Sequence, residues 1–268
     1  MDRTSKILSM MSRATRRVVG DYAHHLRALG RSPNTIEART YWLLRLCQET
    51  GRTPAQQDAA SIEAWLAAHD WSRATRRVVV TGLRQFYAWA GADPDPTAGL
   101  TAPRQPAYRA RPIPDDALAR GMAAASRQDW WMLRTFATTG LRRSELAAMR
   151  PRDVAGSWLT VRGKGGRVRR VPLPPDVAAY LASLSEPMWP DSNGRPLSGP
   201  AITVRCHTLT GHGPHAIRHR YATRAYAASH DLAAVQRLLG HASIATTQQY
   251  LAVGDDELVA AAGAAWAA

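Results

Sequence analysis

Two segments in the first third of the chain carry apolar residues at helical spacing. The first begins at Ser32 and Pro33, where serine can cap a helix and proline can occupy its first turn, and it ends at Gly51. The second begins at Ser72 and ends at Gly91. The apolar stripes consist of Ile36, Leu43, Leu44 and Cys47 in the first segment and of Val79, Leu83, Phe86 and Ala90 in the second. This pattern predicts a helical domain over residues 21–92.

The pattern after residue 115 is also mainly helical, with one β-prone interruption. An apolar run at 130–138 ends at Gly140, and a helix is expected from Arg143 onward. Residues 157–161 and 168–171 are β-prone, and the connecting RGKGGR predicts a hairpin with Lys164 at its glycine-rich tip. Two later helical stripes consist of Ile217, Tyr221, Ala225 and Ala228, and of Leu232, Val235, Leu238 and Leu239. We therefore expect a mainly α fold with a small β-hairpin or sheet, an α+β arrangement in two domains.

A proline-rich basic stretch separates the two regions. Residues 93–114 hold prolines at 94, 96, 103, 106, 112 and 114, and this length exceeds the usual connection inside one domain. We expect an extended linker with the domain boundary near residue 107. Before it, residues 1–20 are predicted to form a basic N-terminal extension. After it, a second domain is expected over 115–254, followed by an acid-started helix over 255–268.

Charge narrows the choice of partner. The 268 residues include 35 Lys and Arg against 21 Asp and Glu, giving a formal net charge of +14 and a pI near 10.9. Such a balance favours a polyanion, and double-stranded DNA is the default expectation. Arginines on the predicted helix after Ser72 and in the linker are candidate DNA contacts: Arg73, Arg77, Arg84, Arg104, Arg109 and Arg111. A solvated basic face is an equally good interpretation of the helical arginines by themselves, and the net charge and the linker favour DNA.

The remaining composition indicates the compartment. Cys47 and Cys206 are too few and too far apart for a disulfide framework or a zinc site, which favours a reducing environment. The N-terminus shows no secretory signal, and the longest apolar stretch, 258–268, is too short to span a bilayer. We expect a cytoplasmic protein with no membrane partner.

One octapeptide occurs twice. The residues SRATRRVV stand at 12–19 and again at 72–79. The unit is too short for a solenoid repeat. The second copy is predicted to begin a helix.

The second half supplies the side chains needed to break a phosphodiester without a metal. They are Arg142, Lys164, His215, Arg218, His241 and Tyr250. A tyrosine is a poor nucleophile at its ordinary pKa, so the phosphate needs cationic groups around it, and the planar fork of arginine can hold two phosphate oxygens. Taken one at a time, each residue is more often structural. His212 and His215 form an H-x-x-H pair, but without a third ligand phosphate contact is the better interpretation of His215, so no metal site is predicted.

Four segments in order resemble the signature regions of the tyrosine site-specific recombinases, also called the phage integrase family. They are TGLRRSEL at 139–146, VRGKGGRVRRVPL at 161–173, PHAIRH at 214–219 and LLGHASIATTQQY at 238–250. The resemblance spans the whole second half, and the helical first half is similar to the family's core-binding domain. Four pieces in register are far more specific than one.

The resemblance implies a role for each residue. Arg142 matches the first catalytic arginine, Lys164 the hairpin lysine, His215 and Arg218 the His-x-x-Arg pair, His241 the second histidine and Tyr250 the nucleophile. Glu145 matches the acidic residue that supports the arginine, and His219 follows the pair as in many relatives. Arg220 stands where a small hydroxyl residue is more usual, which lies beside the core chemistry.

The implied reaction leaves a 3′-phosphotyrosyl link, so religation needs no metal, ATP or other cofactor. Lys164 would protonate the departing 5′ oxygen, and His215 would take the tyrosine proton. We expect a compact phage or mobile-element integrase acting at specific core sites in duplex DNA. An Xer-like resolvase of chromosome or plasmid dimers is the alternative, and a non-catalytic DNA-binding regulator is a third hypothesis.

The resemblance also predicts the assembly. The chain is expected to be a monomer in free solution and a homotetramer on synapsed DNA, with residues 255–268 docked on a neighbouring protomer. An accessory directionality protein is a possible further partner.

Overall fold

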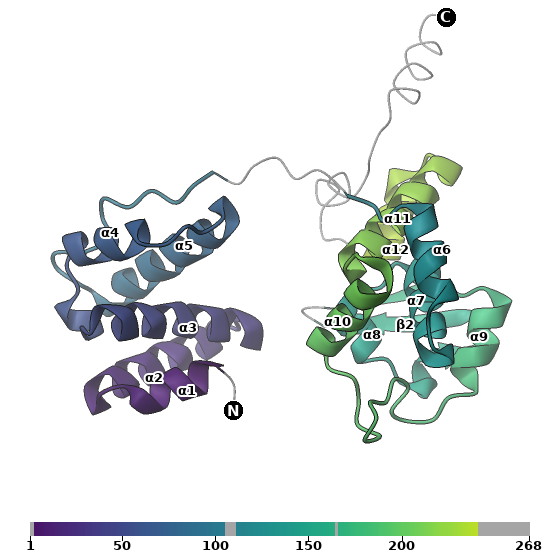
Figure 1. The fold of residues 1–268 in the computed structure, drawn as a ribbon, viewed down its shortest axis with the longest axis horizontal. Coiled ribbons are helices and arrows are strands. Elements are labelled where there is room, and N and C mark those ends of the chain that lie inside the picture. Colours follow the sequence, from purple (N-terminus) through teal and green to yellow (C-terminus); the bar gives the residue numbers. More distant parts are fainter. Residues whose placement is uncertain (1–2, 105–110, 164–165, 241–268) are drawn as a thin grey trace, which may run out of the picture. The chain divides into compact units, whose positions relative to one another are not determined.

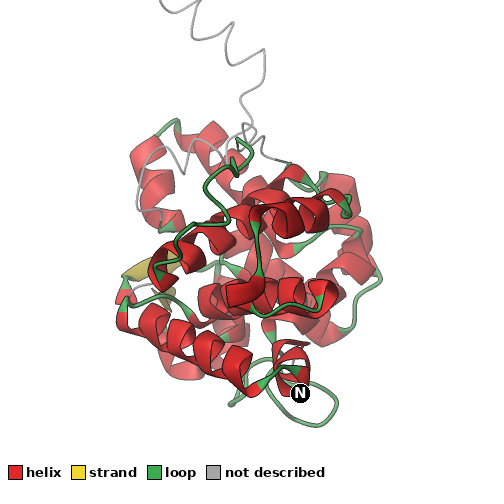
Figure 2. Cartoon of the chain, turned by 90° about the vertical axis from the view of Figure 1, so that its left-hand side faces the viewer, coloured by secondary structure: helices red, strands yellow, loops and turns green. Residues whose placement is uncertain are grey.

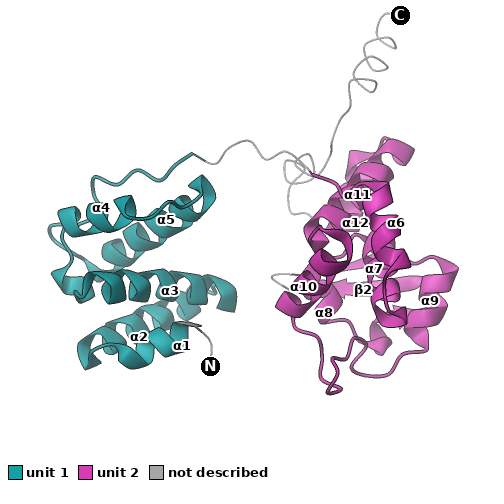
Figure 3. Cartoon of the chain, in the orientation of Figure 1, with its two compact units in different colours: residues 1–107 teal, residues 108–268 magenta. Residues whose placement is uncertain are grey.

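The computed structural model describes residues 3–104, 111–163 and 166–240. The chain divides into two compact units, residues 1–107 and 108–268, each with its own hydrophobic core (Figure 3). Helices dominate both units, and the strands of the described residues form one small sheet (Figure 2). The expected fold class, mainly α with a small β element, is confirmed.

The first unit is a helical bundle (Figure 1). Its elements are α1 (Arg3–Met10), α2 (Arg13–Ala28), α3 (Pro33–Thr50), the 3₁₀ turn η1 (Pro54–Gln56), α4 (Ala59–Ala67) and α5 (Arg73–Ala90). Ser32 and Ser72 each accept a bond from the amide three residues on, at the start of α3 and α5. Gly51 and Gly91 end these helices in the left-handed conformation. The two helices predicted from the sequence therefore begin and end as expected.

The apolar stripes of these helices form the core with one exception. Leu43, Leu44, Val79 and Phe86 are at most 2% exposed. Ala90, at the end of the predicted stripe, is the last residue of α5 and is exposed.

The expected separation of residues 1–20 as a basic extension is not seen. Helix α2 runs from Arg13 through residue 20 without a break, and Thr15 and Val19 are 2% and 3% exposed in the core. Both copies of SRATRRVV thus begin a helix, with Ser12 and Ser72 as caps. The arginines of the first copy favour a solvated extension, but its apolar side packs into the core and makes it part of the helical unit.

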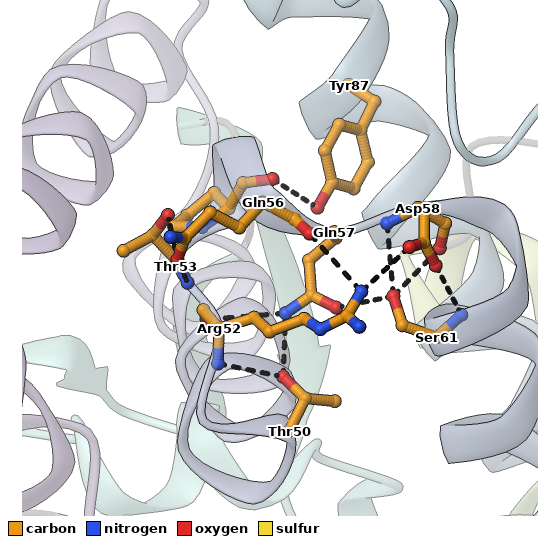
Figure 4. A network of polar contacts seen from close by, with 9 residues as sticks. Thr50, Arg52, Thr53, Gln56, Gln57, Asp58, Ser61 and Tyr87 are labelled. Carbon is orange, nitrogen blue, oxygen red and sulfur yellow. Dashed lines mark hydrogen bonds and ion pairs between the residues drawn. The ribbon is translucent and has the colours of Figure 1, made fainter.

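A polar network fixes the connection between α3 and α4 (Figure 4). Gln57 Nε2 donates to Thr50 Oγ1 at 2.7 Å, and Arg52 Nη1 lies 2.8 Å from Asp58 Oδ2. Asp58 caps α4 by accepting from the Ser61 amide at 2.7 Å. That backbone bond, followed by the one from Arg52, lowers the pKa of Asp58 to about 2. The connection is therefore held by its own side chains.

The second unit wraps helices around a small antiparallel sheet. Its elements are α6 (Asp115–Ala123), α7 (Arg127–Thr139), α8 (Arg143–Ala147), η2 (Pro151–Asp153), β1 (Val154–Ala155), β2 (Trp158–Arg162), β3 (Val168–Pro172), α9 (Pro175–Ala182), α10 (Gly199–Thr210), α11 (Pro214–Ser229) and α12 (Leu232–Leu239). The strand order is β1-β2-β3, and β2 pairs with β3 from Trp158 opposite Pro172 to Arg162 opposite Val168. This is the predicted hairpin, with β1 added at its edge.

The residues that the structure describes include no helix long and apolar enough to cross a membrane. Both cysteines are buried and free, and burial raises the pKa of each thiol to about 12. They lie in different units, so each behaves as a small core residue.

Candidate functional site

Arg142 stands at a sharp junction between two helices. Helix α7 ends at Gly140, whose φ of +61° is left-handed, and α8 begins at Arg143. A Cβ at Gly140 would lie 2.2 Å from Tyr221 Cδ1, so only glycine fits. The junction places the Arg142 side chain, 32% exposed, at the N-terminus of α8.

Glu145 holds Arg142 in two ways. Its Oε2 accepts the Arg142 backbone amide at 2.8 Å, and its Oε1 accepts Arg142 Nη1 at 2.8 Å. The Glu145 side chain is only 4% exposed. Burial alone would raise its pKa, but hydrogen bonds from Arg169 and from the Arg142 amide outweigh burial and lower the pKa to about 2. Glu145 is therefore a fixed anion that orients the guanidinium above it.

Arg169 was missed by the sequence reasoning. It donates from Nη1 to Glu145 Oε1 at 2.8 Å and from Nη2 to Oε2 at 2.7 Å. It lies two residues before Val171 on β3, so it shares the face of that buried residue. The alternation of Arg169 with Val171 on a predicted strand, which puts a charge on the buried face, was the sequence signal for it.

Arg218 is the most buried charge among the described residues of the second unit. It projects from α11 with 0% exposure, donating from Nη1 to the Gly140 carbonyl and from Nη2 to the Leu239 carbonyl at 2.8 Å. It thus ties the α7–α8 junction to the end of α12. Arg142 reaches the same end, since its Nη2 donates to the Gly240 carbonyl at 3.3 Å.

His215 lies one turn before Arg218 on α11, at the surface. Partial desolvation lowers its pKa, and the nearby charges of Arg218, Arg142 and Arg143 lower it further. The ring is therefore held in its neutral form near pH 7, able to accept a proton. His219, the other predicted residue of this helix, is 1% exposed, and its ring centroid lies 5.6 Å from that of His215.

Arg220 has a structural partner. Its Nε donates to Asp115 Oδ1, and Arg224 Nη1 donates to Asp115 Oδ2 at 3.1 Å. These pairs join α11 to the first residue of α6, where the linker ends, and Arg220 is the main reason that the pKa of Asp115 is lowered. Arg220, which stands where a small hydroxyl residue is more usual, therefore forms a contact between α11 and α6.

Three predicted site residues, Lys164, His241 and Tyr250, lie outside the described residues, as does Arg109. The described residues just before two of them border the cluster. A Cβ at Gly163 would lie 3.6 Å from Glu145 Oε1, and the Gly240 carbonyl accepts from Arg142. Gly163 and Gly240, which directly precede Lys164 and His241, thus lie next to the Arg142–Glu145 pair.

The cluster carries an excess of positive charge. Arg142 and Arg169 share one carboxylate, Glu145, while Arg218 donates to the Gly140 and Leu239 carbonyls. Fixed guanidinium groups with this surplus can bind and polarise an anion such as a phosphodiester. Within the described ranges, no group of three His, Cys, Asp or Glu residues could hold a metal ion.

The predicted DNA-contacting arginines are all at the surface where the structure describes them. Arg73, Arg77 and Arg84 are exposed on α5, and Arg104 and Arg111 are exposed within the linker. Arg77 Nη1 also donates to the Pro103 carbonyl at 3.0 Å.

Comparisons with known proteins identify the family of the chain. The sequence model described as the phage integrase family matches residues 202–257. The tyrosine recombinase XerC of Rhodospirillum centenum is 34% identical over 287 residues, covering 90% of this chain and 83% of the relative. The tyrosine recombinase XerA of Pyrococcus furiosus is 29% identical over 258 residues, covering 88% and 89%.

Solved structures show the same fold. A lambda integrase dimer bound to a core site matches with a TM-score of 0.69 at 18% identity, covering 88% of this chain and 76% of that one. The XerA recombinase crystal structure matches with a TM-score of 0.51 at 22% identity, covering 91% and 96%. The chain belongs to the tyrosine recombinase family, enzymes that break and rejoin DNA strands. Both curated relatives named above are Xer proteins.

Proposed function

We propose that this chain is a site-specific recombinase in which Tyr250 attacks a DNA phosphate held by Arg142 and Arg218. The observation that carries the proposal is the convergence of both arginines on the ends of α7 and α12, beside the segments that lead to Lys164 and His241. Arg142 comes from the α7–α8 junction, and Arg218 and His215 come from α11. Together they supply the cationic and hydrogen-bonding groups that stabilisation of a pentavalent phosphorus requires.

The proposed step balances without a metal. A bond forms between Tyr250 Oη and phosphorus, and the bond from phosphorus to the 5′ oxygen breaks. The tyrosine proton passes to His215, and Lys164 gives a proton to the leaving 5′ oxygen. Arg142, Arg218 and His241 hold the phosphate oxygens. Because the 3′-phosphotyrosyl link retains the energy of the phosphodiester, attack by another 5′ hydroxyl rejoins the strands without ATP.

The environment of His215 supports its proposed role as the general base. A general base must be neutral at the working pH, and the lowered pKa of His215 favours that form. Glu145 supports Arg142 by its two hydrogen bonds and needs no contact with DNA.

A suicide DNA substrate with a nick near the cut tests the proposal. Wild-type protein should form a covalent protein–DNA adduct, and Tyr250→Phe should bind the same DNA without forming it. The matched control is Tyr226→Phe, on α11 of the same unit, which should form the adduct at the normal rate. A wild-type gel shift with no adduct would instead support the DNA-binding regulator.

The cellular role is proposed to be Xer-like. A phage or mobile-element integrase was the first expectation from the sequence, but the similarity to the XerC and XerA proteins named above favours resolution of chromosome or plasmid dimers. A strain that lacks the gene should accumulate plasmid dimers, and the wild-type gene should restore monomers. Unchanged dimer content, together with failure of a mobile element to integrate, would support the integrase.

The domain roles are part of the same proposal. Residues 21–92 would bind core-site DNA, the 93–114 linker would join that domain to the catalytic domain over 115–254, and the exposed arginines of α5 would contact phosphates. The active form would be a tetramer on synapsed DNA, built from monomers in the cytoplasm. An accessory protein would set the direction of exchange.

The segment 255–268 lies outside the described residues and is proposed to dock on a neighbouring protomer. Its deletion should weaken synapsis of two sites while leaving binding to a single site intact. Full recombination by the truncated chain would rule out this role.

A further inference from the structure

Arg169 is a charged residue at an inward-facing position of a strand. It lies on β3 opposite Val161, on the face that buries Val171, and its side chain is 11% exposed. A guanidinium so placed loses hydration and must find partners in the protein. The partners it finds all belong to the proposed cleavage site.

Each nitrogen of the Arg169 guanidinium donates to a different acceptor. Nη1 and Nη2 donate to the two oxygens of Glu145 at 2.8 and 2.7 Å, and Nε donates to the Leu238 carbonyl at 2.8 Å. The paired bonds to Glu145 have the bidentate geometry that fixes a carboxylate in orientation as well as in place. Since Glu145 orients Arg142, the position of Arg142 depends on Arg169.

Two glycines pack against the same guanidinium. A Cβ at Gly240 would lie 2.9 Å from Arg169 Cδ and 3.0 Å from its Nη1. A Cβ at Gly163 would lie 4.0 Å from that Nη1. Gly163 immediately precedes Lys164, and Gly240 immediately precedes His241. The Arg169 side chain therefore lies against the two glycines that precede Lys164 and His241. Through Glu145 it is also linked to Arg142, which makes three backbone segments that carry a proposed site residue.

We propose that Arg169 is a positioning residue for strand cleavage, which locks Arg142 through Glu145 and fixes the end of α12 at Leu238. The inference rests on the proposed function. Arg169 does not touch the phosphate, since each of its nitrogens already donates to Glu145 or Leu238. Its contribution is to the geometry of the groups that do.

The same contacts predict which replacements fail. Glutamine at 169 leaves Glu145 with the Arg142 bonds alone and frees the Leu238 carbonyl. Lysine keeps a positive charge, but one ammonium cannot span both Glu145 oxygens and also reach Leu238. Activity should therefore fall in the order wild type, Arg169→Lys, Arg169→Gln.

The matched control is the next residue. Arg170 lies on the same strand but is exposed, with its guanidinium 4.7 Å from the centre of the Trp158 ring. Arg170→Gln removes the same charge from the protein without touching Glu145 or α12. It therefore separates loss of charge from loss of positioning.

The experiment measures single-turnover adduct formation on the suicide substrate at saturating protein, with the rate divided by the fraction of folded protein from thermal melting. DNA affinity is measured separately by gel shift. Arg169→Gln should cleave ~100-fold more slowly than wild type, the loss typical of a small misplacement of reacting groups. Its affinity for DNA should stay within about threefold, because phosphate contacts elsewhere dominate binding. Arg170→Gln should cleave at the wild-type rate.

Several outcomes would overturn the inference. A wild-type rate per folded molecule in Arg169→Gln would show that the residue only stabilises the fold. Equal losses in Arg170→Gln, or a loss of affinity that accounts for the whole loss of rate, would show a charge effect instead. A wild-type chain that forms no adduct overturns the proposed function and the inference with it, whereas a normal rate in Arg169→Gln beside an active wild type overturns the inference alone.

Discussion

At the scale of single residues, the site is organised by one buried carboxylate. Glu145 accepts four hydrogen bonds, two from Arg142 and two from Arg169, and its pKa is lowered to about 2. A buried anion is costly unless it is fully paired, and the two guanidinium groups supply that pairing. Arg142 is thereby held in one orientation while about a third of its side chain stays accessible.

His215 gives a prediction on pH. Partial desolvation and the neighbouring arginines lower its pKa below the ordinary histidine value, about 6.5, so the neutral base is the main form at pH 7. The cleavage rate should therefore be constant between pH 7 and about pH 8. It should fall in acid, at a pH below about 6.5. Single-turnover adduct formation across pH 5–8 measures it.

Two variants complete that test. His215→Asn should lower the rate ~10²- to 10⁴-fold and remove the acid limb of the profile. His212→Asn, in the loop just before α11, should leave both rate and profile unchanged. An acid limb that persists in His215→Asn at the same pH would show that another group is the base.

At the scale of elements, the site depends on where helices end. Helix α7 stops at Gly140 and α12 at Gly240, both with positive φ, and the carbonyls of these glycines and of Leu239 accept the bonds from Arg142 and Arg218. Unpaired carbonyls are a general property of helix C-termini. Here two such ends face each other, and the catalytic arginines of the proposal satisfy them.

Gly140 and Gly211 allow the role of close packing to be measured. Both end a helix with positive φ, +61° and +71°, but a Cβ at Gly140 would lie 2.2 Å from Tyr221 Cδ1 and a Cβ at Gly211 would meet nothing within 4 Å. Gly211→Ala should cost only the left-handed conformation, about 1–2 kcal/mol. Gly140→Ala should cost the same plus a clash of about 1–3 kcal/mol. Urea unfolding of the second unit measures both, and equal losses would contradict the proposed packing.

At the scale of the whole molecule, the net charge of +14 is the broad signal for DNA. The repeated octapeptide offers a way to locate the part of that charge that binds. In the second copy Arg76 Nη2 donates to the Leu66 and His69 carbonyls, so it is structural, while Arg73 and Arg77 are exposed. In the first copy Arg13 and Arg17 are exposed at the equivalent positions.

The two copies therefore give a matched pair of variants. Replacing Arg73 and Arg77 with glutamine should reduce the slope of log affinity against log salt by about 2, since each phosphate contact contributes about 0.9. Replacing Arg13 and Arg17 should leave the slope unchanged if only α5 lies along the DNA. Gel shifts at several salt concentrations measure the slopes, and equal reductions by both pairs would mean that the charge acts without a preferred face.

The sequence by itself determined the family, the fold class and most of the helices. Capping serines, terminating glycines and apolar spacing act locally, which is why the helices that begin at Pro33 and Arg73 end at Gly51 and Gly91 as expected. The four signature segments in order were enough to predict a tyrosine recombinase, which the relatives confirm. Glu145 was predicted to support Arg142, and the structure shows the two in contact.

Only the tertiary structure decided which side chains hold one another. Arg169 and Glu145 are 24 positions apart, and Arg218 and Gly140 are 78 apart, so their bonds depend on how strands and helices pack. Packing likewise made the start of the chain part of the core, because Thr15 and Val19 face inward on α2. Local patterns fix which elements form, whereas a site assembled from the ends of distant elements exists only after those elements have packed.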